Sequence, residues 1–403
     1  MALMPVAEAL ARVLADATPL PPDLASLKDA HGRVLAADLT ALRTQPPTHV
    51  SAMDGYAVRA ADVAKVPATL KLIGEVAAGH PFKGAVGAGE AARIFTGGVL
   101  PPGSDTIVIQ ENTSRQGDTV VVTTSASEGR HIRVAGLDFA SGAVLLEKGR
   151  RLSDRDLALA AAMNHPRVPV HRRPRLAVLA TGDELVMPGT MPGLGEIVYS
   201  NGYATMALAN REGCDVLDLG IVPDRLEETA AAVRRARDLG ADVLVTSGGA
   251  SVGDYDLVQT ALASEGLTLS FWKVALRPGR PMMHGRLGSM HVLGLPGNPV
   301  SAYVCAVLFL VPLIRRLCGR ADVEPVSEPA LLGCDLPAND ERADYLRATL
   351  TTGPGGVPIA TPAPVQDSSM LTPLAAADCL LLRAPHAPAA KAGETCAIIR
   401  LAV

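Results

Sequence analysis

The feature that most constrains this chain is a regular alternation of apolar strands and helices between residues 175 and 319. Strands are predicted at 176–180, 216–221, 243–246 and 291–295, and helices at 201–212, 225–239, 256–265 and 300–317. A glycine closes each predicted helix, as is common at helix C-termini. Strands that alternate with helices form a parallel sheet covered on both faces. The sequence therefore predicts a doubly wound α/β domain, in which ligands bind beyond the carboxyl ends of the strands.

The segments on either side of this alternation have a different pattern. Apolar residues at helical spacing predict one helix near the N-terminus and another at 152–163, with Ser153 as its N-cap, and we expect these two helices to pack together. Between them, short β-branched runs at 70–76, 90–95, 106–110 and 119–124 are typical of a small antiparallel β domain. This β segment is therefore expected to be an insertion into a helical domain. From Val323 onward, short apolar pairs among prolines and glycines predict a β barrel or sandwich.

The composition excludes several classes of protein. The 403 residues are 48% hydrophobic and 19% charged, which is typical of a globular protein with a large core. A net charge of -4 does not indicate a protein that binds nucleic acid or a membrane surface through positive charge. The N-terminus lacks the pattern of a signal peptide, and the most apolar stretch, 302–314, is shorter than the ~20 residues that span a bilayer. We therefore expect a soluble, cytoplasmic protein.

The cysteines are scattered and include no Cys-x-x-Cys pair, so their spacing supports neither a zinc site nor a disulfide framework. Reduced core residues are the expected assignment, since free cysteine is usually buried. The six residues are Cys214, Cys305, Cys318, Cys334, Cys379 and Cys396.

Two adjacent acids directly follow the first strand of the α/β domain. Thr181 and Gly182 lead into Asp183 and Glu184, at the strand end where a ligand would bind. Carboxylates in such a place can hold Mg²⁺ or act as an acid or base. The alternative is a helix-capping acid with a solvated neighbour, and these residues alone leave both open.

A glycine-rich segment follows the third strand, over residues 246–256 (TSGGASVGDYD). Glycines let the backbone approach a phosphate closely, and successive N–H groups form an anion-binding nest. An ordinary glycine turn does not require several glycines, hydroxyls and acids together. The segment therefore favours a phosphate-binding site.

The fourth strand ends in Pro-Gly-Asn-Pro before a helix, over residues 295–301. Free amides and Ser301 at a helix N-terminus can bind an anion, although a plain helix start with Asn298 as N-cap and Pro299 at N1 accounts for the same pattern. Upstream, the stretch 271–281 carries three cations, two of them in a rigid Arg-Pro-Gly-Arg-Pro frame, and this combination suits an oxyanion. A solvated basic loop is the alternative there.

Two further patterns have ordinary structural explanations. Asp54-Gly55 within 51–59 is typical of a hairpin turn. Asp224 begins an Asp-x-x-Glu sequence before a helix, which a capping box explains.

Taken together, these segments resemble the MoeA family, the molybdenum-inserting enzymes of molybdenum cofactor synthesis, which are related to the E domain of gephyrin. The resemblance runs in order through SAMDGYAVR (51–59), RIFTGG (93–98), TGDEL (181–185), LGIVPD (219–224), SGGASVGDYD (247–256), RPGRP (277–281) and GLPGNPVSA (294–302). It covers nearly the whole chain. Arg277 and Arg280 replace residues that are often lysine in the family, and Ala250 stands where valine is common.

The resemblance implies a multidomain α/β architecture with four domains. These are an elongated helical domain (1–44 and 140–172), an inserted β lid (45–139), the doubly wound molybdopterin-binding domain (173–322) and a C-terminal β barrel (323–403). It also implies an elongated homodimer, whose active site lies between the α/β domain of one subunit and the lid and fourth domain of the other.

The implied reaction inserts molybdate into the dithiolene of adenylylated molybdopterin, with Mg²⁺-dependent release of AMP. The adenylyltransferase of the same pathway is a possible protein partner, and neither nucleic acid nor a membrane is expected as one. Two alternatives are an adenylyltransferase with a related α/β domain, against which the lid and barrel argue, and a gephyrin-like scaffold.

The resemblance and the strand-end motifs assign roles to named residues. The expected catalytic residues are Asp54, Thr96, Asp138, Glu184, Asp224, Asp256 and Lys273, with Asp54 and Thr96 contributed across the dimer. The expected substrate-binding residues are Thr181, Gly182, Ser247, Gly248, Gly249, Ser251, Gly253, Asp254, Gly297 and Asn298. Molybdate is expected at Arg277, Arg280, Pro281, Ser301, Arg347 and Ser368, and Mg²⁺ at Asp183, Glu184 and Asp256.

Overall fold

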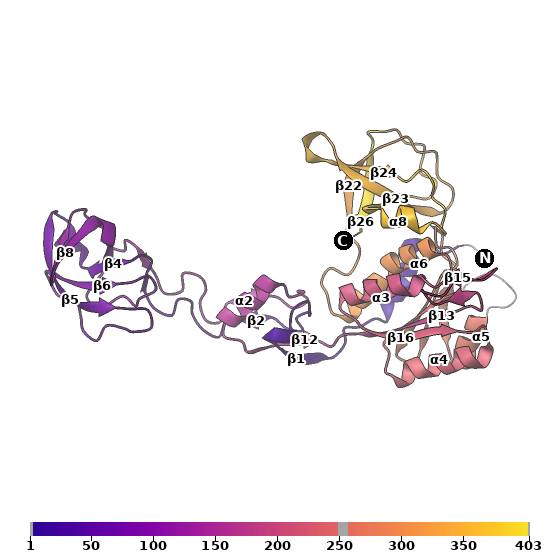
Figure 1. The fold of residues 1–403 in the computed structure, drawn as a ribbon, viewed down its shortest axis with the longest axis horizontal. Helices are drawn as coiled ribbons and strands as arrows, with labels where there is room; N and C mark the ends of the chain where they lie inside the picture. The colour runs from indigo at the N-terminus through magenta and orange to yellow at the C-terminus, as the bar shows by residue number, and fades with distance from the viewer. Residues whose placement is uncertain (1–2, 249–256, 402–403) are drawn as a thin grey trace.

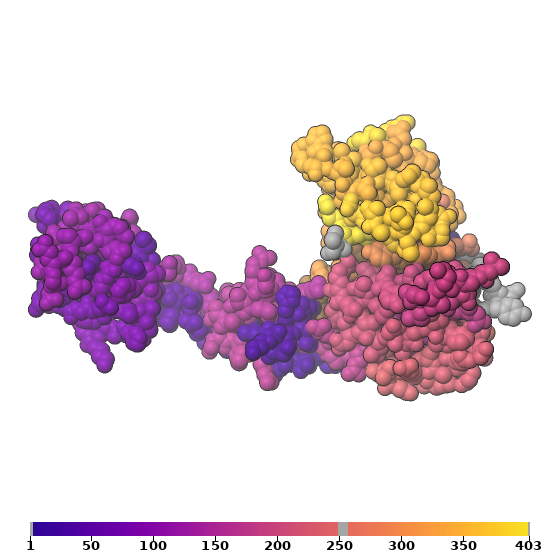
Figure 2. Space-filling model, viewed as in Figure 1, coloured from indigo at the N-terminus to yellow at the C-terminus, as the bar shows by residue number. Residues whose placement is uncertain are grey.

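The computed structural model describes residues 3–248 and 257–401. The molecule is elongated, with a β-rich lid at one end and the α/β domain at the other, beneath the C-terminal barrel (Figure 1). A narrow middle segment joins the two ends. In the space-filling view, a broad open space separates the lid from the barrel on the upper side of the middle segment (Figure 2).

The α/β domain is built on a six-stranded sheet with the order β16-β13-β17-β21-β20-β18. Its strands are β13 (Arg175–Thr181), β16 (Asp215–Val222), β17 (Val243–Ser247), β18 (Thr268–Trp272), β20 (Met283–Leu287) and β21 (Met290–Leu295). β16, β13, β17 and β21 are parallel, as predicted, but β20 runs antiparallel to both of its neighbours, β21 and β18. The two-residue Gly288-Ser289 connection enforces this, because only antiparallel strands can be joined so tightly.

Helices cover both faces of this sheet, which confirms the doubly wound arrangement. The helices are α3 (Asn201–Glu212), α4 (Leu226–Asp238), α5 (Leu257–Ser264), α6 (Pro299–Cys305) and α7 (Val311–Leu317). Val233 of α4 and Leu262 of α5 share one buried cluster with Leu244 of the sheet. Leu208 of α3 and Leu313 of α7 share another cluster with Val245, whose side chain points to the opposite face.

The helix predicted at 300–317 is interrupted by a π-helical turn at Ala306–Leu310. Pro312 follows at the start of α7, and a proline has no N–H with which to continue the regular α-helical ladder. Within the described residues, Pro299–Leu317 is the one helix long and apolar enough to cross a membrane. Because most of this helix is buried inside the protein, it is a core helix of the α/β domain.

The N-terminal helix α1 (Val6–Ala15) packs on the α/β domain. Its buried residues Ala9 and Val13 join the cluster that contains Leu313 and Leu317 of α7. The expected packing of this helix with the 152–163 helix is therefore wrong. That helix, α2 (Asp154–Ala162), has the predicted Ser153 N-cap and lies in a separate cluster of the middle segment.

The middle segment consists of α2 and two antiparallel strand pairs. β1 (Pro22–Ser26) pairs with β12 (Arg167–His171), and β2 (Leu39–Thr40) pairs with β11 (Val144–Leu146). A bridge between Gln45 and Phe139 marks where the chain leaves for the lid and returns from it. The division into four domains at the stated residues stays a prediction.

The lid sheet has the order β7-β4-β6-β5-β9-β8. Its strands are β4 (Gly55–Val58), β5 (Ala68–Val76), β6 (Glu90–Ile94), β7 (Thr106–Ile109), β8 (Thr113–Gln116) and β9 (Thr119–Val122), and the short pair β3 (Val50–Ser51) and β10 (Ile132–Arg133) lies beside them. The sheet is not wholly antiparallel as predicted, because β5 and β6 are parallel. The long connection over residues 77–89 makes this possible, and its Phe82 and Val86 pack on the sheet.

The C-terminal part is a closed barrel rather than a sandwich. Its strands are β22 (Ser327–Leu332), β23 (Ala343–Thr352), β24 (Pro358–Pro362), β25 (Cys379–Arg383) and β26 (Thr395–Arg400), and the β23–β25 pairing closes the ring. The short helix α8 (Leu371–Ala375) lies between β24 and β25 in the chain. All six cysteines are free, and four of them are buried, as expected for reduced core residues.

Candidate active site

The carboxyl ends of β13, β17 and β21 meet at one edge of the sheet. In the strand register, Thr181 of β13 lies opposite Val222 of β16, and Ser247 of β17 lies opposite both Ala180 and Leu295. The three predicted strand-end motifs are thereby brought together. This edge is where ligands bind in doubly wound domains.

Gly182 and Gly248 at this edge both have a backbone conformation that favours glycine, and Gly248 is in addition required by close approach to the backbone. A Cβ on Gly248 would lie 2.5 Å from the carbonyl oxygen of Thr181, and both glycines have positive φ. A Cβ on Gly182 would lie 2.5 Å from Oε2 of Glu184. The hydroxyls of Thr181 and Thr246 are buried and have no hydrogen-bond partner among the described residues. Since buried polar groups are normally paired, these hydroxyls are candidates to contact a ligand.

Three carboxylates lie beside this edge, on the loops after β13 and β16. Oδ1 of Asp183 accepts a hydrogen bond of 3.1 Å from the backbone N–H of Asp224. Burial raises the pKa of Asp224, and the negative charges of Glu184 and Asp183 raise it further. The helix that follows begins at Leu226, with Arg225 at the N-cap position, so Asp224 does not cap it. The interpretation of Asp224 as a helix cap is therefore wrong. Its carboxylate lies beside those of Asp183 and Glu184 instead.

The described residues contain no ready-made group of three or more His, Cys, Asp or Glu side chains that could hold a metal ion. Oxygen ligands from one or two carboxylates, completed by substrate phosphates and water, are nevertheless what Mg²⁺ requires. Asp183 and Glu184 fit that requirement. Five expected site residues, Gly249, Ser251, Gly253, Asp254 and Asp256, lie outside the described residues.

The start of α6 is joined to the barrel by a pair of hydrogen bonds. Asn298 occupies the N-cap position, but its side-chain Nδ2 donates to Oγ of Ser368 at 2.9 Å and makes no cap bond. The backbone N–H of Val300 donates to the carbonyl oxygen of Ser368 at 3.0 Å. Gly297 is also fixed, because its carbonyl accepts a 2.7 Å hydrogen bond from Asn201 at the start of α3. The expected residues Asn298, Ser301 and Ser368 are therefore brought together at one helix N-terminus.

Arg347, an expected molybdate contact, has its guanidinium buried in this structure. The residue is 1% exposed. Its Nη1 donates to the carbonyl oxygens of Asp367 and Met370, and its Nε donates to Oε1 of Gln366. In this structure Arg347 holds the 365–370 loop, and with it Ser368, in place.

The Arg-Pro-Gly-Arg-Pro loop separates its two arginines. Arg277 forms ion pairs with Asp340 and Asp344 of the barrel. Arg280 is exposed, and its side chain has no hydrogen bond or ion pair within the described part of the chain. Pro281, also expected at the molybdate site, is half-buried next to Arg280. Lys273 has a left-handed backbone with φ 74° and its ammonium lies 4.4 Å from the centre of the Trp272 ring.

The lid carries a second polar cluster. Oδ1 of Asp54 accepts hydrogen bonds from the backbone N–H and from the hydroxyl of Thr96, both at 2.8 Å. These bonds hold the pKa of Asp54 below its ordinary value. Asp54 precedes β4, a central strand, so the predicted hairpin turn is wrong. A Cβ on Gly55 would lie 2.1 Å from the carbonyl oxygen of Val108, which explains the glycine.

Sequence reasoning missed Arg93 in this cluster. Its guanidinium lies 5.1 Å from the Tyr56 ring centre and 4.9 Å from that of Phe95, and Nη2 donates to Gln110 at 2.6 Å. Arg93 is the first residue of the RIFTGG motif. Its sequence signal was its place between an apolar run and the aromatic Phe95. Asp138, another expected acid, lies exposed in the turn where the chain leaves the lid, and its backbone N–H donates to Gln45.

The lid cluster and the strand-end site lie at opposite ends of the molecule (Figure 1). Within one chain the structure does not bring Asp54 and Thr96 to Thr181 and Glu184. These two groups of expected site residues therefore form separate surfaces of the single chain.

Comparison with known proteins accounts for nearly the whole chain. Residues 4–164 match the model of the MoeA N-terminal region (domain I and II), residues 177–316 match a probable molybdopterin binding domain, and residues 329–401 match the MoeA C-terminal region (domain IV). The molybdopterin molybdenumtransferase of Nostoc sp. is 37% identical over 81% of this chain and 77% of its own. That of Haemophilus influenzae is 33% identical over 93% of this chain and 92% of its own.

Solved structures agree with these relatives. The crystal structure of the molybdopterin biosynthesis MoeA protein from Pyrococcus horikoshii OT3 is 28% identical, covers 99% of this chain and 100% of its own, and has a TM-score of 0.85. The chain thus matches the family in sequence, in the order of its regions and in fold. It belongs to the MoeA family of molybdopterin molybdenumtransferases.

Proposed function

We propose that this protein inserts molybdate into the dithiolene of adenylylated molybdopterin and releases AMP in a Mg²⁺-dependent reaction. The family makes the chain a molybdopterin molybdenumtransferase of molybdenum cofactor biosynthesis. The observation that carries the finer proposal is the sheet edge at which two unpaired hydroxyls, two glycines with positive φ and three carboxylates meet. Backbone and hydroxyl donors suit phosphates, and the carboxylates suit a divalent ion beside them.

In this proposal the phosphates of the substrate lie against Thr181, Ser247 and Gly248. Backbone N–H groups and hydroxyls at the strand ends donate to the phosphate oxygens, which binds them without a large basic surface. Molybdate, the second substrate, lies between Arg280 and the start of α6, where Ser301 and Ser368 can donate to its oxygens. The tie between Asn298 and Ser368 keeps the two sides of this space at a fixed separation.

Asp183 and Glu184 are proposed to hold Mg²⁺, with Asp256 as a further ligand. When bound, the ion would neutralise charge that develops on the phosphate of the leaving AMP. The role of the protein's own residues is to position the substrate beside the ion. Asp224, whose pKa is raised beside Asp183 and Glu184, is placed to accept a proton or orient a water at this edge.

We propose that the functional unit is a homodimer in which each strand-end site is completed by Asp54 and Thr96 of the other subunit. The separation of the two clusters within one chain supports this arrangement (Figure 1). Cytoplasmic location and a partnership with the adenylyltransferase of the pathway stay predictions.

Incubation of the full chain with adenylylated molybdopterin, Mg²⁺ and molybdate tests the reaction. AMP release and reconstitution of a molybdoenzyme are the two measurements, and both should require molybdate and Mg²⁺. Glu184→Ala should abolish AMP release, whereas Glu227→Ala, an exposed acid of the neighbouring helix α4, should not. AMP release without any dependence on molybdate would overturn the proposal. Consumption of ATP and molybdopterin instead would favour the adenylyltransferase alternative.

A further inference from the structure

We propose that Arg93 is a positioning residue of the lid, which fixes the backbone at Asp54 and keeps a positive charge beside that carboxylate. Arg93 acts through Asp54 in this proposal and not on a substrate. The part that concerns the reaction rests on the proposed function, because it takes Asp54 to serve the active site. The contacts of Arg93 do not depend on that function.

The strand register brings Arg93 and two aromatic rings to one face of the lid sheet. Arg93 of β6 lies opposite Tyr56 of β4, and Phe95 follows two residues later in the chain. Residues opposite each other and residues two apart point to the same face of a sheet. The guanidinium carbon of Arg93 is accordingly 5.1 Å from the centre of the Tyr56 ring and 4.9 Å from that of Phe95. Both distances lie within the ~6 Å range of a cation–π interaction, so the two rings restrict the position of the guanidinium.

Two hydrogen bonds connect this guanidinium to the backbone at Asp54. Nη1 donates to the carbonyl oxygen of Gly55, the residue after Asp54, at 3.3 Å. Nη2 donates to Oε1 of Gln110 at 2.6 Å, and the backbone N–H of Gln110 donates in turn to the carbonyl oxygen of Asp54 at 3.1 Å. The carbonyl of Gly55 is therefore held by Arg93 directly, and that of Asp54 is held through Gln110.

The carboxylate of Asp54 needs this support because its own hydrogen bonds reach a different strand. Both donors to Oδ1 belong to Thr96, which lies three residues after Arg93 and just beyond the end of β6. A shift of Asp54 relative to β6 would lengthen both 2.8 Å bonds. Arg93 is part of β6 and contacts the backbone next to Asp54, so it fixes the same two segments to each other.

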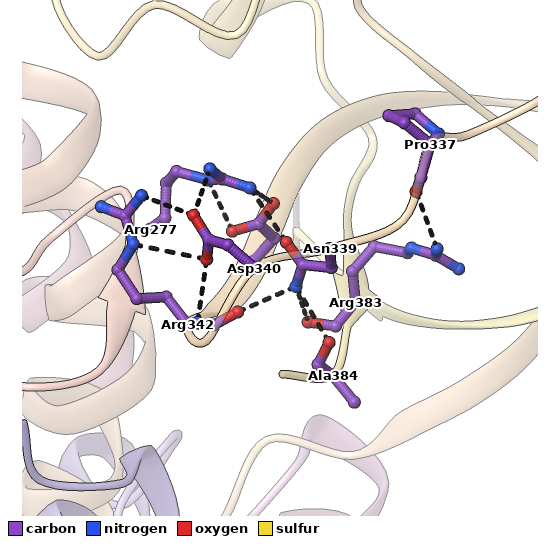
Figure 3. A network of polar contacts seen from close by, with 8 residues as sticks. Arg277, Pro337, Asn339, Asp340, Arg342, Arg383 and Ala384 are labelled. Carbon is purple, nitrogen blue, oxygen red and sulfur yellow. Dashed lines mark hydrogen bonds and ion pairs between the residues drawn. The ribbon is translucent and has the colours of Figure 1, made fainter. Parts of the chain in front are cut away.

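The groups that bind Arg93 leave its positive charge available to Asp54. Both of its hydrogen-bond acceptors are neutral oxygens. The guanidinium of Arg277 has the opposite environment, because it is paired with carboxylates of the barrel that include Asp340 (Figure 3). A cation with neutral partners still stabilises a nearby carboxylate in its ionised form. The hydrogen bonds from Thr96 lower the pKa of Asp54 most, and the charge of Arg93 lowers it further.

Other titratable side chains lie on the elements around this cluster. Glu75 of β5 is opposite Arg93 in the strand register, and Glu111 belongs to the turn after β7; both are exposed. Their negative charges would raise the pKa of Asp54 rather than lower it. Burial lowers the pKa of His131, so this side chain is neutral near pH 7. Because the two glutamates titrate at acid pH as well, the pKa has to be measured at Asp54 itself.

Three full-length variants test the proposal. Arg93→Met removes the charge and both hydrogen bonds, whereas Arg93→Lys keeps a charge but not the planar fork. Arg115→Met is the matched control, because Arg115 is an exposed arginine of the same sheet on β8, whose Nε donates to Gly117. NMR titration gives the pKa of Asp54 without any substrate. Steady-state AMP release gives kcat and the KM values for molybdate and for adenylylated molybdopterin.

We expect Arg93→Met to raise the pKa of Asp54 and to lower kcat roughly tenfold with little change in either KM. Arg93→Lys should keep the pKa of Asp54 low and lose less of kcat, and Arg115→Met should match the wild type in both measurements. If Arg93→Met does not fold, Arg93→Gln replaces it. Glutamine keeps an N–H donor for Gly55 but carries no charge, so the same rise in pKa is expected.

Two results would overturn the inference. One is an Asp54 pKa that is the same in Arg93→Met, or in Arg93→Gln, as in the wild type. The other is a KM raised about tenfold with kcat unchanged, since Arg93 would then bind a substrate directly instead of positioning Asp54. A wild-type protein without molybdate-dependent AMP release contradicts the proposed function instead, and the NMR titrations still decide whether Arg93 acts on Asp54.

Discussion

The side-chain amide of Asn298 donates a 2.9 Å hydrogen bond to the hydroxyl of Ser368, and this contact joins the first turn of α6 to a loop of the barrel. The two residues are 70 positions apart in the chain. The proposed molybdate site is thus bordered by Asn298 of the α/β domain on one side and by Ser368 of the barrel on the other. Arg347 donates hydrogen bonds to the backbone carbonyls of Asp367 and Met370 in the same loop. Ser368 is therefore held by α6 on one side and by Arg347 on the other.

Ser368→Ala should raise the KM for molybdate by roughly threefold to tenfold with little change in kcat, because the site loses a hydroxyl donor and the side-chain hydrogen bond from Asn298, while the bond from the Val300 N–H remains. The hydrogen bond is exposed, so we expect the free energy of unfolding to change by about 1 kcal/mol or less. Molybdate titrations of AMP release measure the effect. Ser369→Ala is the matched control, because the hydroxyl of Ser369 donates to Asp367 of the same loop. Equal effects of the two variants would contradict a specific role for Ser368.

Thr96→Val should raise the pKa of Asp54 toward its ordinary value. The hydroxyl of Thr96 is one of the two donors that lower this pKa, and valine keeps the backbone N–H but removes the hydroxyl. A carboxyl whose pKa rises is protonated at higher pH, so the acid limb of the pH–rate profile should shift upward. NMR titration of Asp54 measures the pKa directly, without substrate. An unchanged pKa would show that the hydroxyl of Thr96 does not contribute to it.

Subunit complementation tests whether the lid acts across a dimer. Asp54→Ala and Glu184→Ala should each abolish activity. After the two proteins are mixed and allowed to exchange subunits, about one quarter of wild-type activity should return, because half of the dimers contain one intact site of two. A mixture of Asp54→Ala with Asp54→Asn is the control and should stay inactive. If the first mixture also stays inactive despite proven exchange, both residues serve a site within one chain.

Glu212→Gln should destabilise the α/β domain by about 3–5 kcal/mol, because it removes the buried carboxylate that pairs with Arg315 and Arg320, and Asp322 compensates only the second of these arginines. Glu212 is 4% exposed and accepts hydrogen bonds from Arg315 and Arg320. Chemical unfolding of the wild type and the variant measures the difference. Glu228→Gln, which breaks an exposed ion pair with Arg225, should cost about 1 kcal/mol or less.

The same carboxylate should make stability depend on acid pH. Burial raises the pKa of Glu212, but hydrogen bonds and charge from Arg315 and Arg320 outweigh it, and the net pKa is lowered. The unfolded state therefore binds the proton more readily than the folded state. The stabilisation is present above the ordinary pKa of a glutamate and is lost as the pH falls toward the lowered value. Glu212→Gln should flatten this acid dependence, and an unchanged slope would contradict the assignment.

Much of the fold was predictable because its signals are local. The strands β13, β16, β17 and β21 and the helices between them follow from apolar runs and glycine stops along the chain. The antiparallel edge formed by β20 and β18 was not predicted, although the two-residue Gly288-Ser289 turn was a usable signal. The packing of α1 was also missed. Its amphipathic pattern shows that one face is buried but not which domain covers it.

The candidate site was predictable as a set of motifs but not as a geometry. Spacing placed Thr181, Ser247 and Asn298 after strands, and parallel strands necessarily end at one edge. The spacing did not show that Arg277 and Arg347 have their guanidinium groups occupied by the barrel. The residues next to Arg277 and Arg347 in the sequence do not reveal whether each guanidinium binds a ligand or another part of the protein.

The sequence by itself determined the four parallel strands of the α/β domain with the helices that follow them, the β character of the C-terminal part and, through its motifs, the family of this protein, because each depends on residue order and short-range patterns. The tertiary structure decided which side chains meet. Arg277 contacts Asp344 and Asn298 contacts Ser368 across 67 and 70 residues, respectively. Such pairs depend on how two domains are placed against each other, and that placement results from the summed burial of many residues rather than from any one motif.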